Sequence, residues 1–400
     1  MSDSRPGPVR SPPLWLLILA TATGPASLHV ILPSIPALAR DFATSAGEAQ
    51  LALTVFLGSM AFAQIVYGPL SDRYGRRPVL LLGLAAYVAG TILCAAAWSI
   101  ESLLAGRFVQ AFGGCAGMVL GRAIVRDVHG RERSASLIAY ITMAMSLAPM
   151  AAPALGGFLE EWAGWRWSFI VLSAVGTLTL VCAWPLLTET RATVVPIHPQ
   201  AIAANFWLLL RSRPFLGYML GTSFATAAWY SFCAGAPYLL VAALDQSPSA
   251  YGLWILPVML GYTLGNMVAG RFAPRLGLDR MIRLGNGFTL LGAVVMVAWT
   301  QADGLSAPAL FGSMTIMTWG HGLGQPNGVA GALSVHPHIA GSASGLLGFV
   351  QMTVSAGVTL LLGAVQAPSA GPTVAVVAVT TALSVGCFML ATAARRRPTA

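Results

Sequence analysis

The sequence predicts an all-α membrane protein in which twelve transmembrane helices form two pseudo-symmetric six-helix bundles. Of the 400 residues, 56% are hydrophobic and only 9% are charged, which is too few polar residues to cover a water-soluble surface. Apolar stretches long enough to cross a bilayer, about 20 residues each, recur along nearly the whole chain. A short motif of the first half also recurs in the second half, which indicates a duplicated unit.

The apolar stretches define the expected spans. In the first half they cover residues 14–37, 48–70, 78–98, 101–122, 135–159 and 167–187. In the second half they cover residues 214–241, 250–271, 281–300, 307–331, 340–363 and 370–393. The longest polar connection lies between the two sets. We therefore predict an N-terminal six-helix bundle at 1–187, a central cytoplasmic loop at 188–213 and a C-terminal six-helix bundle at 214–400.

The arginines predict which connections face the cytoplasm. All 22 basic residues are arginines, and apart from Arg40, Arg107 and Arg166 they fall at the termini or in alternate connections. Positive residues gather on the cytoplasmic side of a membrane, so we expect a multi-pass protein of the bacterial inner membrane with both termini cytoplasmic. This asymmetry also accounts for the net charge of +9 without a nucleic-acid partner.

The repeated motif occupies the same position in each half. It comprises Gly68, Arg73 and Gly75 after the second span and Gly270, Arg275 and Gly277 after the eighth, at a constant offset of 202 residues. Duplicated six-span units of this kind are related by an axis along the membrane normal and bind their substrate between them.

The segment around the first copy of the motif reads GPLSDRYGRRP. Its glycines permit a tight reversal, Asp72 can interact with the N-terminus of a neighbouring helix, and its arginines hold the cytoplasmic face. A merely basic turn is the alternative. The segment resembles the signature GxLSDRxGRR of the major facilitator superfamily. The resemblance implies gating roles for Gly68, Asp72, Arg73, Gly75, Arg76 and Arg77.

Other segments resemble the Bcr/CflA-type exporters of bicyclomycin and chloramphenicol within that superfamily. Arg107, Gln110 and Gly113 in LLAGRFVQAFGG resemble the fourth-span signature of proton-coupled members, although Ala111 replaces the usual glycine. RAIVRD, GWRWSFI and AGSASGLLGFVQ resemble the drug-exporter branch. The first of these segments contains Arg122, Arg126 and Asp127.

The fifth span resembles the antiporter signature of the same superfamily, with Ala152 in place of the commoner glycine. Its prolines lack a backbone donor and its glycines present small surfaces, so this helix can bend and pivot. Tight packing alone is the alternative. The signature residues are Pro149, Pro153, Gly156 and Gly157.

The acidic proton carrier of this branch is replaced in the present chain. Relatives place an aspartate just before the LPxxP segment of the first span, where this chain has His29, and no Asp or Glu lies near the middle of a predicted span. Histidine, with an ordinary pKa near 6.5, can exchange a proton in its place; a neutral packing residue is the alternative. His321 is a second candidate.

Arg107 is the one permanent charge that we place inside a span. Such a residue requires a partner at membrane depth, and the resemblance implies a proton-linked switching role for it. The alternative is that the side chain snorkels to the outer face.

The charges of the predicted cavity favour one class of substrate. An arginine, two histidines and no embedded carboxylate suit neutral or anionic molecules better than multivalent cations, so we expect an uncharged amphipathic drug of the phenicol type. Aromatic and amide side chains of the spans can line such a site, although for each of them taken singly packing or an interfacial belt is the favoured explanation. The candidates are Gln64, Tyr67, Trp229, Tyr230, Phe232, Trp254, Trp319, Gln325, Asn327 and Phe349.

The resemblance implies a monomeric secondary transporter that exports drugs in exchange for protons by alternating access. The chain lacks lysine, so a GxxxxGK phosphate loop cannot occur, and we expect no ATP and no cofactor. A metabolite exporter, a nutrient importer or a non-transporting receptor would share the scaffold. A membrane-embedded enzyme is disfavoured, because the spans carry no clustered metal-binding carboxylates and no nucleophile with a base. His336 and His338 are too few ligands for a metal site.

Overall fold

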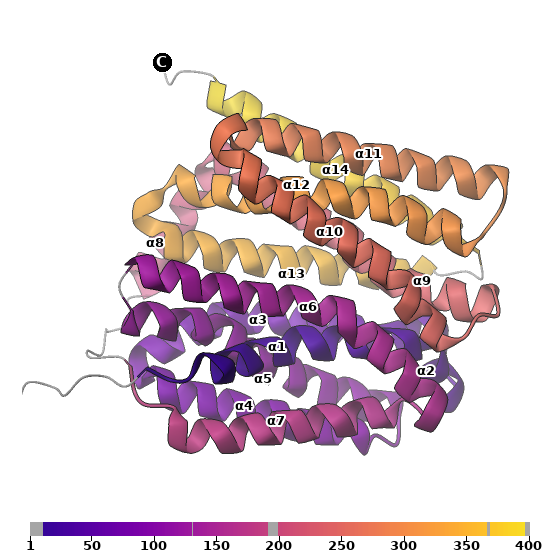
Figure 1. The fold of residues 1–400 in the computed structure, drawn as a ribbon, viewed down its shortest axis with the longest axis horizontal. Helices are drawn as coiled ribbons and strands as arrows, with labels where there is room; N and C mark the ends of the chain where they lie inside the picture. The colour runs from indigo at the N-terminus through magenta and orange to yellow at the C-terminus, as the bar shows by residue number, and fades with distance from the viewer. Residues whose placement is uncertain (1–10, 130, 191–198, 366–368, 397–400) are drawn as a thin grey trace, which may run out of the picture.

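A computed structural model describes residues 11–129, 131–190, 199–365 and 369–396, and its long helices run side by side in two groups (Figure 1). The first group consists of α1 (Leu14–Val30), α2 (Ile35–Asp41), α3 (Ala46–Tyr74), α4 (Arg76–Ala95), α5 (Ile100–Val128), α6 (Arg131–Ala163) and α7 (Arg166–Leu186). The second group consists of α9 (Arg213–Tyr238), α10 (Pro248–Leu276), α11 (Leu278–Ala302), α12 (Ser313–Val335), α13 (Ala340–Val365) and α14 (Gly371–Arg396). The predicted all-α membrane fold is confirmed.

Eleven stretches of the described residues are long and apolar enough to cross a membrane. They coincide with every predicted span except the tenth, residues 307–331, which is nevertheless helical: a π-helical turn at Pro308–Gly312 leads into α12. Glycines, His321, Gln325 and Asn327 lower the hydropathy of α12. Because α9, α10 and α11 all pack against it, this helix meets protein where other spans meet lipid, and polar residues are tolerated there.

The first predicted span differs from a single helix. The α-helix α1 ends at Val30, a 3₁₀ turn covers Leu32–Ser34, and α2 begins at Ile35. Pro33 and Pro36 have no backbone N–H to continue the helical ladder, which explains the break. The sequence indicated the LPxxP segment but not its interruption of the span.

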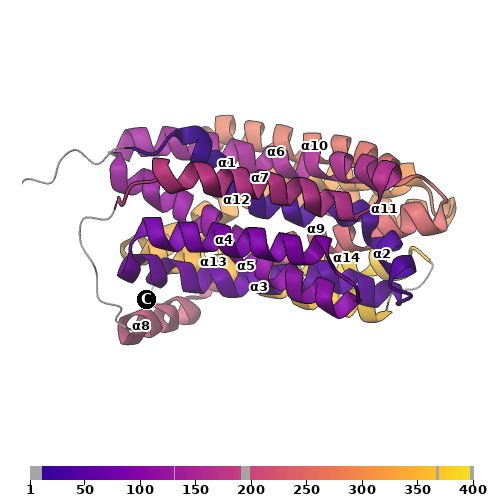
Figure 2. The same ribbon diagram turned by 90° about the horizontal axis from the view of Figure 1, so that it is seen from below.

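The connection predicted as a loop at 188–213 contains a helix, α8 (Pro199–Arg211). Figure 2 shows α8 beside the bundle, near the end at which α14 finishes. Its apolar residues belong to a stretch too short to span a bilayer, which is why hydropathy alone did not separate it from the loop.

Serine side chains cap the N-termini of three helices at one end of the molecule. The hydroxyl of Ser45 accepts from the N–H of Glu48 at 3.2 Å, and the Glu48 carboxylate accepts from the N–H of Ser45 at 2.9 Å. Ser99 caps α5 and Ser247 caps α10 in related ways. These caps satisfy backbone donors that the first helical turn leaves free. We call this the outer end, and the opposite end, which carries Gly75 and is predicted to be cytoplasmic, the inner end.

The repeated motif folds alike in both halves. Gly75 follows α3 at φ +95° and Gly277 follows α10 at φ +81°, a region open to glycine. The N–H of Gly75 donates to the carbonyl of Ser71 at 3.1 Å, and that of Gly277 donates to the carbonyl of Ala273 at 2.9 Å. Donors and acceptors are again 202 residues apart, as a duplicated unit requires.

The two groups meet along two pairs of helices. Across the boundary α3 packs against α13 and α6 packs against α10. Gly47 of α3 and Gly363 of α13 approach so closely that a Cβ on Gly47 would overlap the Gly363 carbonyl. Small residues at such crossings let helix backbones approach within membranes.

Candidate functional site

Arg107 of α5 is fully enclosed in the first group. Its Nη1 donates to the carbonyl of Ser27 at 2.9 Å and to Gln110 Oε1 at 2.7 Å. Its Nε donates to the carbonyl of Ala52 at 3.1 Å, and its guanidinium lies 4.1 Å from the centroid of the Phe56 ring. Carbonyl oxygens, an amide and an aromatic face are therefore its partners at membrane depth. The side chain does not snorkel, because it has no exposed surface.

The network around Arg107 continues into α4. Gln110 Nε2 donates to Thr91 Oγ1 at 3.0 Å, and the hydroxyls of Ser27 and Tyr87 are hydrogen-bonded at 2.8 Å. Gly113, one turn from Gln110, has no room for a side chain, since a Cβ there would overlap the backbone of Tyr87. The fourth-span signature residues thus hold α4 against α5 and position Arg107.

His29 lies in the last turn of α1, directly before the proline break, and is 3% exposed. Its Nδ1 donates to the carbonyl of Pro25 at 2.8 Å. Its Nε2 is buried and has no hydrogen-bond partner among the described residues. Its ring centroid lies 6.3 Å from the rings of Trp229 and Tyr230, which belong to α9 of the second group. His29 therefore faces the boundary between the groups.

The structure does not bring the three proton-carrier candidates into one cluster. Within the described residues no hydrogen bond or ring contact joins His29 to Arg107, which faces the interior of the first group. His321 lies on α12 and is 7% exposed, and its buried Nε2 also lacks a hydrogen-bond partner in the part of the chain that the structure describes.

Polar side chains form hydrogen bonds around the next turn of α12, which contains Gln325 and Asn327. Gln325 Nε2 donates to Thr226 Oγ1 of α9 at 2.8 Å, and Gln325 Oε1 accepts from the Tyr262 hydroxyl of α10 at 3.4 Å. Asn327 Nδ2 turns back to the carbonyl of Leu323 at 2.8 Å. Gln325 therefore links three helices of the second group, whereas Asn327 bonds within its own helix.

Two of the predicted aromatic residues of the second group contact a residue that sequence reasoning missed. Phe311, in the π-helical turn before α12, has its ring centroid 5.3 Å from Phe232, 5.8 Å from Trp254 and 5.9 Å from Tyr251. Phe232, Tyr251 and Phe311 are fully buried, whereas Trp229 and Trp254 are partly exposed. The first three pack as core, and nothing in the sequence distinguished Phe311 from other span residues.

The remaining predicted lining residues lie apart from one another. Gln64 of α3 faces Gly348 of α13 across the boundary, where a Cβ on Gly348 would overlap its amide oxygen. Tyr67 is buried against the ring of Phe112 at 5.1 Å, inside the first group. The side chains of Trp319 and Phe349 are partly exposed and pack against apolar residues of the second group.

A charge cluster forms where α3 turns into α4 at the inner end. Arg76 pairs with Asp72 at 2.8 Å and, through its Nε, with Asp127 of α5 at 2.9 Å. Glu189, which follows α7, accepts from the backbone N–H groups of Arg76 at 2.9 Å and Arg77 at 3.1 Å. The cluster ties α3, α4, α5 and the end of α7 together. Sequence reasoning identified its members except Glu189, whose distance along the chain concealed the contact.

Other arginines of the resembling segments make contacts of their own. The guanidinium of Arg77 donates to the carbonyls of Leu187 at 2.8 Å and Trp184 at 2.9 Å. Arg73 lies 5.2 Å from the Tyr74 ring, and Arg122 Nε donates to the carbonyl of Met118 at 3.2 Å. Gly68 has open space around it, and Arg126 is exposed.

The antiporter-like glycines of α6 bring three helices together at the outer end. A Cβ on Gly156 would overlap the carbonyl of Val30 at the end of α1. One on Gly157 would overlap the carbonyl of Pro248 at the start of α10. These glycines therefore permit close packing across the boundary. The prolines of the same signature, which α6 contains, are Pro149 and Pro153.

Polar contacts also join the two groups at the outer end. Gln50 Nε2 donates to the carbonyl of Thr359 at 3.2 Å, and the hydroxyls of Thr54 and Thr359 are hydrogen-bonded at 3.0 Å. The carboxylate of Glu161 in α6 accepts from the N–H of Ser249 in α10 at 2.8 Å. We call these contacts of α3 with α13 and of α6 with α10 the outer seam. Sequence reasoning missed all five residues, because none belongs to a recognisable motif.

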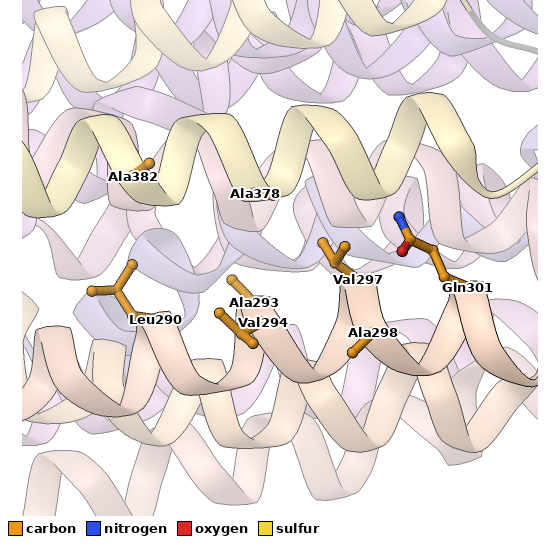
Figure 3. A pocket seen from close by; sticks show the side chains of 8 residues that line it. All are labelled: Leu290, Ala293, Val294, Val297, Ala298, Gln301, Ala378 and Ala382. Carbon is orange, nitrogen blue, oxygen red and sulfur yellow. The ribbon is translucent and has the colours of Figure 1, made fainter.

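A hollow of about 380 Å³ lies elsewhere, between α11 and α14 (Figure 3). Its walls are apolar except for Gln301. Figure 1 shows α11 and α14 on the side of the second group that is turned away from the first. This hollow is therefore not the site expected between the halves.

Comparisons with known proteins give consistent relatives. A family model described as Major Facilitator Superfamily matches residues 17–238. An uncharacterized MFS-type transporter, YdgK of Bacillus subtilis, is 32% identical over 387 residues, covering 95% of this chain and 92% of that protein. A chloramphenicol resistance protein of Pseudomonas aeruginosa is 31% identical over 326 residues (79% and 75% covered). A bicyclomycin resistance protein homolog of Haemophilus influenzae is 27% identical over 350 residues (87% and 88% covered).

Solved structures show the same fold at low sequence identity. A peptide transporter POT in complex with sulfate superimposes with a TM-score of 0.76 at 15% identity, covering 95% of this chain and 93% of that chain. A D-xylose-proton symporter superimposes with a TM-score of 0.72 at 14% identity, covering 94% and 96%. Identities this low carry the fold and nothing about the substrate.

Proposed function

This chain belongs to the Major Facilitator Superfamily, and we propose that it exports small uncharged amphipathic drugs across the bacterial inner membrane in exchange for protons. Members of this superfamily are secondary transporters and not enzymes. One observation carries the proton half of the proposal: His29 is buried, its Nε2 has no partner within the described ranges, and it faces α9 across the boundary between the two groups.

The protonation chemistry of His29 follows from its contacts. Its Nδ1 donates to the Pro25 carbonyl at 2.8 Å, so in the neutral ring Nε2 carries the free lone pair and is the atom that takes up a proton. The resulting cation would lie against the rings of Trp229 and Tyr230, each 6.3 Å away. Aromatic faces attract a desolvated cation, so protonation would draw α1 and α9 together.

Arg107 contributes through position and not by titration. Its guanidinium is fixed by the carbonyls of Ser27 and Ala52, and Ser27 lies on the same helix as His29, two residues away. A shift of α1 on protonation would strain these hydrogen bonds and so transmit the change to α3 and α5.

Alternating access would then use the outer seam as its outer gate. The seam is closed by contacts of Gln50 with Thr359 and of Glu161 with Ser249. Separation of these contacts would expose His29 to protons and the bound drug to the outside. Closure would return the protonated site to the inner side, where the proton leaves and the next drug molecule enters.

The proposed substrate class rests on the charge of the side chains around the site and on the names of the relatives. The described residues around His29, Gln325 and the aromatic side chains of α9 include no carboxylate contact. A site without a counter-ion for a cation suits uncharged rings with a few hydrogen-bonding groups. Relatives named for chloramphenicol and bicyclomycin resistance support this class.

Drug transport into inside-out membrane vesicles tests the proposal. We expect labelled chloramphenicol to accumulate when an inward-acidic gradient is imposed, and to stop when the gradient is collapsed. His29→Ala should abolish gradient-driven accumulation yet retain drug exchange without a gradient, and His29→Asp should restore part of the coupling. His338→Ala removes an exposed histidine of the α12–α13 connection and serves as the matched control.

Each alternative result assigns a different function or carrier. Coupling that survives His29→Ala but fails in His321→Ala would transfer the carrier role to His321. Accumulation in right-side-out vesicles with an outside-acidic gradient would indicate an importer. Binding of drug without movement in any sealed vesicle would indicate a receptor.

A further inference from the structure

Helix α8 (Pro199–Arg211) is held to the second group by one face only. Leu209 on that face is fully buried, and Phe206 beside it contacts the same apolar cluster. Asn205 Nδ2 donates to Ser342 Oγ, in the first turn of α13, at 3.3 Å. These contacts fix the orientation of α8 against α9 and α13.

The opposite face of α8 is apolar and uncovered by the described chain. Trp207 is 59% exposed, Leu208 is 43% exposed and Leu210 is 42% exposed. The helix contains no acidic residue. A soluble surface helix would carry charged residues on such a face, so this face is suited to an apolar neighbour.

The position of α8 indicates which neighbour that is. After Ser212 the chain enters α9, a membrane span that begins at Arg213, so the C-terminal end of α8 lies at the level where that span leaves the membrane. The guanidinium of Arg211 lies 4.5 Å from the Trp207 ring. Tryptophan and arginine side chains of this kind prefer the boundary between acyl chains and headgroups.

We propose that α8 is an interfacial helix that binds the lipid bilayer at the inner end. Its exposed apolar face, formed by Trp207, Leu208 and Leu210, lies against the acyl chains beneath the headgroups. Arg211 and Arg213, both exposed, bind anionic phospholipid headgroups. The membrane that surrounds α9 supplies this surface without a further protein partner.

Spin-label accessibility of position 208 tests the insertion. We would place a label at Leu208→Cys in the full chain, in a background where the partly exposed Cys182 and Cys387 are alanine, with one copy per lipid nanodisc. Label at 208 should collide with oxygen, which concentrates in acyl chains, more than with a water-soluble nickel chelate. A label at His338→Cys, an exposed position of the α12–α13 connection, should show the reverse order.

Lipid binding tests the role of the arginines. In zwitterionic detergent, we expect the native chain to bind phosphatidylglycerol in preference to phosphatidylcholine when binding is followed by native mass spectrometry. Arg211→Gln with Arg213→Gln should weaken phosphatidylglycerol binding roughly thirtyfold, because each arginine near an anionic surface contributes about 1 kcal/mol and 1.4 kcal/mol is a factor of ten. Arg211→Lys with Arg213→Lys keeps both charges and should retain binding.

Three results would overturn the proposal. The label at 208 could favour the nickel chelate, which would place the face in water. Its protection from the chelate could require two copies in one disc, which would make the occupant a second chain. Equal binding of the two lipids by the native chain would exclude recognition of anionic headgroups.

Discussion

Removal of the Glu189 side chain should destabilise the first group of helices, although Glu189 lies far from the centre of any span. The carboxylate of Glu189 accepts from the backbone N–H groups of Arg76 and Arg77, at 2.9 and 3.1 Å. These are donors of the first turn of α4, which otherwise has no side-chain cap. In Glu189→Ala both donors lose their acceptor, and the favourable interaction of the carboxylate with the N-terminus of α4 is lost.

The size of the effect follows from these contacts. Hydrogen bonds to charged groups contribute about 1.5–3 kcal/mol each when enclosed, but Glu189 is exposed, so we expect a total of about 1–2 kcal/mol. For a bundle of this size each kcal/mol shifts the melting temperature by about 2–4 °C, which gives a fall of about 2–8 °C. Glu189→Gln keeps one acceptor oxygen and should fall between the native chain and Glu189→Ala.

The buried cysteines provide the assay. Cys94, Cys115 and Cys233 are free and buried, so a thiol-reactive fluorophore reports their exposure as the purified protein is heated in detergent. Asp303→Ala, which removes an exposed acid at the opposite end, is the control and should leave the melting temperature unchanged. The reasoning is refuted if Glu189→Ala melts with the native chain, or if Glu189→Gln is the less stable of the two.

Four further substitutions, in three tests, probe other contacts. Gly157→Val should force apart α6 and the Pro248 carbonyl and populate an open outer end, seen as longer distances between spin labels across the seam; unchanged distances would contradict this. Arg107→Met should cost about 2 kcal/mol or more in unfolding free energy, because buried acceptors lose their donor, and should abolish efflux. Thr54→Val and Thr359→Val, whose hydroxyls are hydrogen-bonded, should show a coupling of about 0.5–1 kcal/mol in a double-mutant cycle, whereas additive effects would exclude the contact.

Local pattern was sufficient for much of the fold. Hydropathy located the spans to within about six residues except at two places, because a membrane span must satisfy all its backbone groups within itself and its length is therefore visible in the sequence. The two failures were the proline break after Val30 and helix α8. In the first, the missing N–H donors of the prolines outweigh an unbroken apolar run. In the second, the apolar segment is too short to span a bilayer, so hydropathy does not distinguish it from a loop.

Motifs identified side chains but not always their neighbours. Resemblance to the fourth-span signature singled out Arg107, Gln110 and Gly113, and the structure joins them in one set of contacts with α4. The partners of Arg107 are mostly backbone carbonyls. Every residue has such a carbonyl, so residue types in the sequence do not show which ones Arg107 contacts. His29 points toward α9 because of the way α1 is rotated about its own axis. The sequence of the helix does not specify that rotation.

The sequence by itself determined the class of protein, the approximate positions of the long helices, the duplication at an offset of 202 residues and the charge cluster's arginines and aspartates, because hydropathy, spacing and charge are local properties of the chain. Only the tertiary structure decided that Glu189 caps α4, that Phe311 gathers the aromatic rings, and that Gln50 and Glu161 close the outer seam. These contacts join residues from about sixty to more than three hundred positions apart. Their formation depends on how whole helices rotate and cross, which is set by the packing of many side chains together and by no single segment.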